Sequence, residues 1–215
     1  MKRTSVLIAD DHSLVVEGFR RLLEKDFDII GVAENGRELV AAAKKLQPDL
    51  VLLDISMPLL NGIDAARQIK SILPKVKIIF LTMHGDPTYA AEAFRAGGDA
   101  YVLKRSGVAE LELAIREVMN GRSYVTPLVT KGVLDPTDEP NQSPVSRLMF
   151  HGLTSRQREV LQLVAEGHST KIIADLLNVS VKTIEFHKSG IMERLGIRTT
   201  AELTRYAISH GIVSP

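Results

Sequence analysis

The first 121 residues alternate between two hydrophobic patterns. Short runs of β-branched and aliphatic residues are typical of buried strands, and the stretches between them place apolar residues at helical spacing. The predicted strands cover residues 5–9, 27–33, 50–54, 77–82 and 100–104. Five such strand–helix repeats predict an α/β domain with a doubly wound, five-stranded parallel sheet and helices on both faces.

A different pattern follows. Residues 122–150 contain four prolines among Ser, Asn, Asp and Gln, which predicts a linker. Beyond it the periodicity is purely helical, and the four predicted helices cover residues 155–166, 169–177, 181–195 and 200–210. The sequence therefore predicts a domain over residues 1–121, a linker over 122–150 and an all-α, four-helix domain over 151–215.

Capping residues predict several helix boundaries. Ser13, Asn35 and Ser180 stand at the expected starts of helices, where a side-chain oxygen can accept from a free backbone N–H. Gly167 and Gly196 mark two expected helix ends, because glycine readily adopts the left-handed conformation found there.

Composition narrows the class of protein. A hydrophobic fraction of 45% with 5% aromatics suits a globular protein with aliphatic cores. The absence of cysteine excludes disulfides, thiolate metal sites and thiol nucleophiles. Because no apolar run approaches membrane-spanning length and acids interrupt the N-terminus early, we expect a cytoplasmic protein without membrane contact. Residues 150–215 carry eight Lys and Arg against six acids, which weakly favours a polyanionic partner.

The stretch "DLVLLDISMP" ends a buried strand in Asp54. Polar residues end three other predicted strands: Asp10 and Asp11 follow the first, Thr82 ends the fourth and Lys104 ends the fifth. The carboxyl ends of parallel strands form the ligand crevice of a doubly wound sheet. Crowded carboxylates would repel one another unless a hard cation joined them, so oxygen ligands here indicate Mg²⁺. A single acid at a strand end could equally cap a turn.

With the acidic pair, the "DISMPLLNG" loop, the threonine and the lysine in this order, residues 4–121 resemble the receiver domain of two-component response regulators. The resemblance implies a flavodoxin-like fold in which Asp54 accepts a phosphoryl group. It further implies that Asp11, Asp54 and the backbone carbonyl of Ser56 bind Mg²⁺, with Asp10 acting largely through water. Lys104 would neutralise a phosphoryl oxygen. Thr82 and Tyr101 would form the switch, Thr82 bonding the phosphate and Tyr101 turning inward.

Two residues depart from the receiver pattern. Arg105 follows Lys104 where many receivers carry a cis-linked proline, which leaves the geometry of that peptide open. Asn61 stands where aspartate is common, and we expect this change to matter little.

The stretches "LTSRQREVL", "TIEFHKSGI" and "RLGIRTTAEL" make the C-terminal segment resemble a LuxR-type helix-turn-helix domain. The resemblance implies that residues 181–195 form a helix able to enter the major groove of DNA. The residues expected at the DNA are Ser169, Thr170, Lys171, Lys182, Thr183, Glu185, Phe186, His187, Lys188, Ser189, Arg194 and Arg198. The apolar residues of the same helix are expected in the core: Val181, Ile184, Ile191 and Leu195.

Three residues depart from the LuxR-type pattern. Thr170 replaces a usual Asn, Ile172 replaces a usual Glu, and Gly190 lies in mid-helix at a cost of roughly 1 kcal/mol against alanine. In the last helix Ala201, Thr204, Ala207 and Ile208 form one stripe, which suits either a symmetry mate or the helix's own bundle.

Together the two resemblances imply a transcription regulator that a sensor histidine kinase phosphorylates at Asp54 and that binds promoter half-sites in double-stranded DNA, as a homodimer when phosphorylated. It would be a regulatory protein rather than an enzyme. A phosphatase or phosphotransferase with an Asp nucleophile is the first alternative, but Ser56 stands where such enzymes usually carry a second Asp. The second alternative is an output domain that binds a protein instead of DNA.

Overall fold

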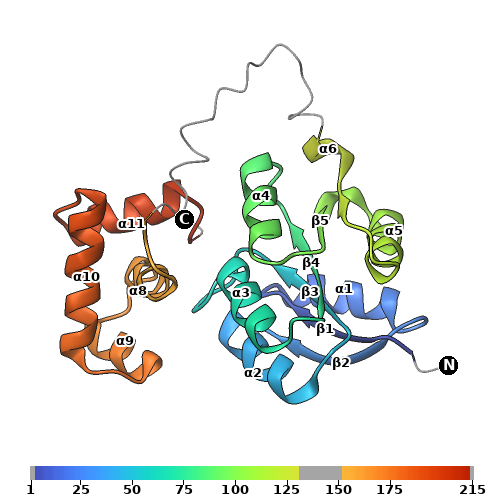
Figure 1. Ribbon diagram of the computed structural model, residues 1–215, viewed down its shortest axis with the longest axis horizontal. Helices are drawn as coiled ribbons and strands as arrows, with labels where there is room; N and C mark the ends of the chain where they lie inside the picture. The colour runs from blue at the N-terminus through green and yellow to red at the C-terminus, as the bar shows by residue number, and fades with distance from the viewer. Residues whose placement is uncertain (1–2, 131–151, 214–215) are drawn as a thin grey trace, which may run out of the picture. The chain divides into compact units, whose positions relative to one another are not determined.

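The computed structural model describes residues 3–130 and 152–213, which form two compact units (Figure 1). The first unit combines a sheet with helices, and the second consists of helices within the residues described. Among these residues, none of the helices is both long and apolar enough to cross a membrane.

A parallel sheet of six strands organises the first unit, in the order β2-β1-β3-β4-β5-β6. The strands are β1 (Ser5–Ala9), β2 (Asp28–Ala33), β3 (Leu50–Asp54), β4 (Lys77–Thr82), β5 (Ala100–Leu103) and β6 (Tyr124–Val125). Five of them match the predicted strands to within one residue at each end. Four of these, β1, β3, β4 and β5, are almost wholly buried apolar runs, whereas the edge strand β2 is half-buried.

The sixth strand differs from the prediction of five. Tyr124 and Val125 pair with Ala100 and Tyr101 of β5, although the sequence placed them in the linker. Two residues carry too short a pattern to be recognised in the sequence, and pairing with β5 and packing of Tyr124 on the core define them as a strand. The remainder of the predicted linker, from residue 131 to 150, lies outside the described residues.

Helices cover both faces of the sheet, as predicted (Figure 1). Alternate strand residues, such as Val6, Ile8, Leu50 and Leu52, share one hydrophobic cluster with apolar side chains of α1 (Ser13–Leu23) and α5 (Val108–Met119). The residues between them, such as Leu7, are equally buried and face the other side. The helices of that side are α2 (Gly36–Leu46), α3 (Gly62–Ile72) and α4 (Pro87–Arg95). Two short elements complete the unit: η1 (Lys104–Ser106) and α6 (Pro127–Thr130).

Two predicted caps of this unit have different outcomes. Asn35 caps α2 as expected, since its side chain accepts from the backbone N–H of Glu38 at 2.9 Å. Ser13 does not cap α1, because it is already the first helical residue and His12 holds the capping position without a side-chain cap bond. The helix starts one residue early because the turn before it is set by Asp10, whose Oδ1 accepts from the backbone N–H of His12 at 3.0 Å.

The second unit is a bundle of four helices: α8 (Ser155–Ala165), α9 (Thr170–Leu177), α10 (Val181–Leu195) and α11 (Thr200–Ser209). Apolar side chains from all four form one core. Ser180 caps α10 as predicted, accepting from Thr183 N–H at 3.1 Å. Gly167 follows α8 with φ 85°, and Gly196 ends α10 with φ 67°, the left-handed conformation expected of both.

Candidate functional sites

An acidic cluster lies at the carboxyl end of the sheet. Asp10 follows β1 and Asp54 ends β3, and these two strands are neighbours, with Ala9 paired to Leu53. Oxygen atoms of Asp10, Asp11 and Asp54 and a ring nitrogen of His12 all lie within 4.8 Å of one another. The structure therefore brings together the three predicted carboxylates, and it adds His12, which the sequence analysis did not include.

Lys104 joins this cluster from the end of the fifth strand. Its Nζ lies 2.6 Å from Oδ2 of Asp10 and 3.0 Å from Oδ2 of Asp54. Burial opposes the charge on Lys104, but the attraction of Asp54 and Asp10 outweighs it and raises the pKa of the ammonium. The Lys104 ammonium is thus held between the two most buried carboxylates of the cluster.

Asp54 is a buried carboxylate with perturbed acidity. Burial raises the pKa of its carboxyl from 3.8 to about 6, although Lys104 opposes the shift. Its Oδ1 accepts from the backbone N–H of Ile55 at 2.8 Å. The β3–α3 loop folds back onto it at Gly62, where a Cβ atom would come within 2.0 Å of the Asp54 carbonyl oxygen. Only glycine fits there, so the "NG" of the loop fixes the backbone around the cluster.

Thr82 and Tyr101 also lie near this end of the sheet. Thr82 is fully buried, and its Oγ1 accepts from the backbone N–H of His84 at 3.1 Å. Tyr101 already lies inward and buried, and its hydroxyl donates to the carbonyl oxygen of His84 at 2.8 Å. Both predicted switch residues therefore contact the same loop, between β4 and α4.

His84, in that loop, was missed by the sequence analysis. Its Nε2 lies 3.0 Å from Oγ of Ser56, and its ring stacks on Tyr89 with centroids 4.4 Å apart. Burial lowers the pKa of the His84 imidazole. The sequence did offer one signal for His84, which is that it lies two residues beyond Thr82, at the end of a predicted strand.

The structure describes both residues that depart from the receiver pattern, Arg105 and Asn61. The peptide bonds of the described residues are trans throughout, and these include the Lys104–Arg105 bond. Asn61 caps α3, since its Oδ1 accepts from the backbone N–H of Asp64 at 2.9 Å. Asparagine performs this capping role as well as aspartate does.

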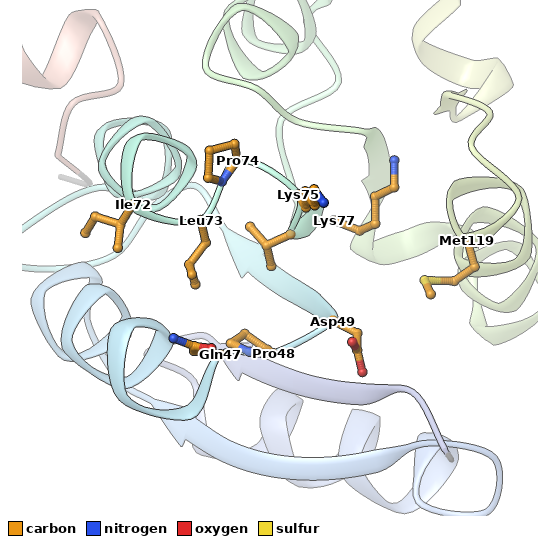
Figure 2. A pocket seen from close by; sticks show the side chains of 10 residues that line it. Gln47, Pro48, Asp49, Ile72, Leu73, Pro74, Lys75, Lys77 and Met119 are labelled. Carbon is orange, nitrogen blue, oxygen red and sulfur yellow. The ribbon is translucent and has the colours of Figure 1, made fainter. Parts of the chain in front are cut away.

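A separate hollow of about 530 Å³ lies at the opposite, amino-end edge of the sheet (Figure 2). Pro48, Ile72, Leu73 and Pro74 supply much of its wall. Lys77 at its edge is already paired with Asp99, at 2.8 Å. This hollow contains none of the predicted site residues.

In the second unit, α9 and α10 are joined by a tight turn in which Asn178 has φ 51°. Ile184 and Ile191 of α10 are buried in the core, as expected. Val181 is not, with 47% of its surface exposed. It is the first residue of the helix, and the prediction of burial was wrong for it. Leu195 is half-buried against the core.

The exposed face of α10 carries several of the predicted DNA-contacting residues. Lys182, Glu185, Phe186 and Ser189 are spaced three, four and seven residues apart and are all exposed. Phe186 is 74% exposed, unusually so for an aromatic side chain. Among the other predicted residues on or just after α10, Arg194 and Arg198 are exposed. The half-buried ones are Thr183, His187 and Lys188.

The remaining predicted contacts lie at the start of α9. Ser169 caps this helix, and its Oγ accepts from Ile172 N–H at 3.3 Å. Lys171 is exposed and Thr170 is half-buried. Ile172 is 47% exposed, as its unusual identity suggested.

Packing explains two features that the sequence left open. A Cβ at Gly190 would lie 3.3 Å from the Gln157 side chain, so this glycine lets α10 approach α8 closely. In α11, Ala207 is fully buried in the bundle core, whereas Ala201 and Ile208 are exposed. The predicted stripe therefore does not act as one face.

Comparison with known proteins agrees with both resemblances. Residues 6–116 match the family described as "Response regulator receiver domain", and residues 151–207 match "Bacterial regulatory proteins, luxR family". The transcriptional regulatory protein DegU of Brevibacillus brevis is 32% identical over 225 residues, which cover 98% of this chain and 95% of that protein.

Two solved structures are similar over nearly the whole chain. One contains two RcsB dimers bound to two parallel DNAs, with 29% identity, a TM-score of 0.59, and coverage of 97% of this chain and 99% of that one. The other is RcsB of Salmonella enterica serovar Typhimurium bound to promoter rprA in the presence of phosphomimetic BeF₃⁻. It has 30% identity and a TM-score of 0.56, and covers 95% of this chain and 98% of that one.

Proposed function

The chain belongs to the family of response regulators that join a receiver domain to a LuxR-type DNA-binding domain, and on this basis we propose that phosphorylation of Asp54 switches its action as a transcription regulator. A sensor histidine kinase supplies the phosphoryl group. The output domain binds promoter DNA as a dimer, as RcsB does in its complex. The protein acts in the cytoplasm and is a regulator, not a metabolic enzyme. The domain limits we propose are residues 1–121 and 151–215.

The observation that carries this proposal is the contact of Lys104 with both Asp54 and Asp10. In the transfer, an Asp54 oxygen forms a bond to phosphorus while the bond from phosphorus to the donor breaks. Lys104 is placed to neutralise a phosphoryl oxygen as this charge shifts. Thr82 ends the adjacent strand and would bond the phosphoryl group once it is attached. Its hydroxyl now accepts from His84 N–H, so that loop would adjust as Thr82 moves.

The donor set suits Mg²⁺, because carboxylate oxygens from three residues converge within 4.8 Å. We propose that Asp11, Asp54 and the Ser56 carbonyl hold the ion, with Asp10 acting largely through water. When bound, Mg²⁺ would supply positive charge for the phosphoryl oxygens. Without a bound metal ion, the negative charge of the crowded carboxylates opposes an incoming phosphoryl dianion.

A phosphatase or phosphotransferase enzyme is the less favoured reading. Ser56 occupies the position of a general acid in such enzymes, and its hydroxyl is hydrogen-bonded to His84 at 3.0 Å. The exposed face of α10 would also have no role in that reading. If the output domain bound a protein instead of DNA, its binding affinity would lack the steep salt dependence that contacts with DNA phosphates produce.

Intact mass spectrometry after incubation with a small acyl phosphate tests the phosphorylation site. The parent chain should gain one phosphoryl group in Mg²⁺ and none in chelator, and Asp54→Asn should gain none. Asp86→Asn alters an acid that caps α4 outside the cluster and should behave like the parent. Labelling of Asp54→Asn, or equal labelling in chelator, contradicts the proposal. Steady release of phosphate by catalytic amounts of protein would favour an enzyme.

A further inference from the structure

His12 contributes a nitrogen atom to the acidic cluster. Its Nδ1 lies 2.9 Å from Oδ1 of Asp11 and 3.2 Å from Oδ1 of Asp10. Nothing in the proposed phosphoryl transfer uses this imidazole. The ring is nevertheless one of only four groups among the described residues whose ligand atoms meet within 4.8 Å.

The backbone holds His12 in this place. Its N–H donates to Oδ1 of Asp10 at 3.0 Å, which folds the segment from Asp10 to His12 into a tight turn. His12 occupies the capping position of α1, but its side chain makes no capping hydrogen bond. The imidazole is therefore directed to the carboxylates and not to the start of the helix. Its side chain is 65% exposed, so the nitrogen lies at the open side of the cluster.

A mixed set of oxygen and nitrogen donors changes which ions a site prefers. Mg²⁺ is a hard ion that takes oxygen ligands and retains water, and it gains little from an imidazole. Divalent transition ions bind imidazole well, and their affinity for such sites rises from Mn²⁺ through Co²⁺ to Ni²⁺. An Asp-Asp-His turn facing Asp54 supplies both kinds of donor.

We infer that His12 is a nitrogen ligand of the cation at this site, which raises the preference of the site for transition ions such as Ni²⁺ over Mg²⁺ beyond what the carboxylates alone would give. The inference deepens the proposed function, because it rests on the acidic cluster being a cation site. Lys104 completes the arrangement from the opposite side: it contacts Oδ2 of Asp10, whereas His12 contacts Oδ1 of the same carboxylate. His12 can thus share an ion with the carboxylates without displacing the lysine that serves the phosphoryl group.

The alternative is that His12 only hydrogen-bonds Asp10 and Asp11 and does not bind the ion. Both readings account for the contacts with Asp10 and Asp11, but only one places the ring nitrogen on the ion itself. Pulsed electron paramagnetic resonance separates them, because a directly coordinated imidazole gives a ¹⁴N coupling to Mn²⁺ that carboxylates and water cannot give.

The experiment uses the full chain without an affinity tag, loaded with one equivalent of Mn²⁺. The parent should show the ¹⁴N coupling, and His12→Ala should bind Mn²⁺ without it. His84→Ala is the matched control, since it removes another histidine beside the cluster and should retain the coupling. In calorimetric titrations, His12→Ala should lower the affinity for Ni²⁺ by about tenfold or more. Its affinity for Mg²⁺ should change by less than about twofold.

Three outcomes overturn the inference. Mn²⁺ bound by the parent without ¹⁴N coupling means that His12 only hydrogen-bonds the carboxylates. An equal loss of Ni²⁺ and Mg²⁺ affinity in His12→Ala means that the residue shapes the turn and does not bind the ion. Failure of the parent to bind either ion contradicts the cation site itself, and with it that part of the proposed function.

Discussion

At the scale of single residues, the main feature is a carboxylate that burial makes less acidic. Asp54 lies 4% exposed beside Asp10, and Lys104 compensates only part of the cost of burying its charge. A shift of its pKa from 3.8 to about 6 corresponds to about 3 kcal/mol of differential interaction. Keeping the Asp54 carboxylate charged in its buried position therefore costs the folded protein free energy.

That cost predicts a stability effect in metal-free protein. Because the folded pKa of Asp54 is raised, the stability that its protonated form provides is complete below pH 3.8 and is lost as pH rises through about 6. Asp54→Asn should therefore raise the free energy of unfolding of the receiver at about pH 8, by up to about 3 kcal/mol, with the gain disappearing near pH 4. Urea unfolding in chelator measures it.

Asp11→Asn is the control for this prediction, since it removes an exposed carboxylate of the same cluster. It should change the unfolding free energy by less than about 1 kcal/mol. A gain for Asp54→Asn that is equal at both pH values would show that the amide stabilises by some means other than the buried charge.

A second prediction at this scale concerns Glu185, an acid on the exposed face of α10. Among the described residues it makes no ion pair with Lys182 or Lys188, so an intrahelical pair does not explain its presence. We predict that it accepts from the amino group of a cytosine, a contact worth about 1 to 3 kcal/mol of discrimination. Selection of sites from random DNA with Glu185→Ala should then lose one C·G preference and retain the rest.

Glu193→Ala removes another exposed acid of α10 and should leave the selected site unchanged. If Glu185→Ala binds more tightly to an unchanged site, Glu185 contributes only repulsion, and base reading by this residue is wrong.

At the scale of elements, local sequence predicted most boundaries, and the errors have physical causes. The central strands were recognisable because continuous apolar runs such as residues 50–53 are typical of strands buried on both faces. Ser13 was misassigned because a hydrogen bond to the preceding Asp10 sets the turn before α1. The arrangement of His84 could not be predicted, since its partner Ser56 is 28 residues away in the sequence.

Capping of α10 gives a prediction for this scale. Ser180→Ala removes the acceptor of the Thr183 N–H and should cost about 1 kcal/mol at the start of the helix. Amide exchange at Thr183 should become about fivefold faster. Ser189→Ala, on the exposed face of the same helix, should leave that exchange unchanged. Equal exchange in the parent and in Ser180→Ala would mean that the hydroxyl does not stabilise the first turn.

At the scale of the whole molecule, the two domain types were predictable because the sequence of each contains a characteristic set of residues in a characteristic order. The acids and the lysine occur at strand ends, and folding of the parallel sheet is enough to bring their side chains together. The addition of His12 to the cluster was not predictable, because its side-chain direction depends on one turn.

Dimeric binding gives a prediction at this scale. Two half-sites about one helical turn apart should bind the protein cooperatively, since both recognition helices then face the same side of the DNA. Inserting about five base pairs between the half-sites should abolish cooperativity, and inserting about ten should restore most of it. Band-shift titrations measure this, and unchanged affinity with the shorter insertion would indicate a monomeric reader.

The central claim is that a phosphoryl group on Asp54 controls DNA binding by α10. It is tested most directly by fluorescence anisotropy of the intact chain on a selected promoter fragment, before and after treatment with a small acyl phosphate and Mg²⁺. The parent should bind at least about fivefold more tightly after treatment, with affinity falling as salt rises. Asp54→Asn should bind equally before and after. The account is contradicted if treatment leaves the parent's affinity unchanged, or if it tightens binding by Asp54→Asn to the same extent.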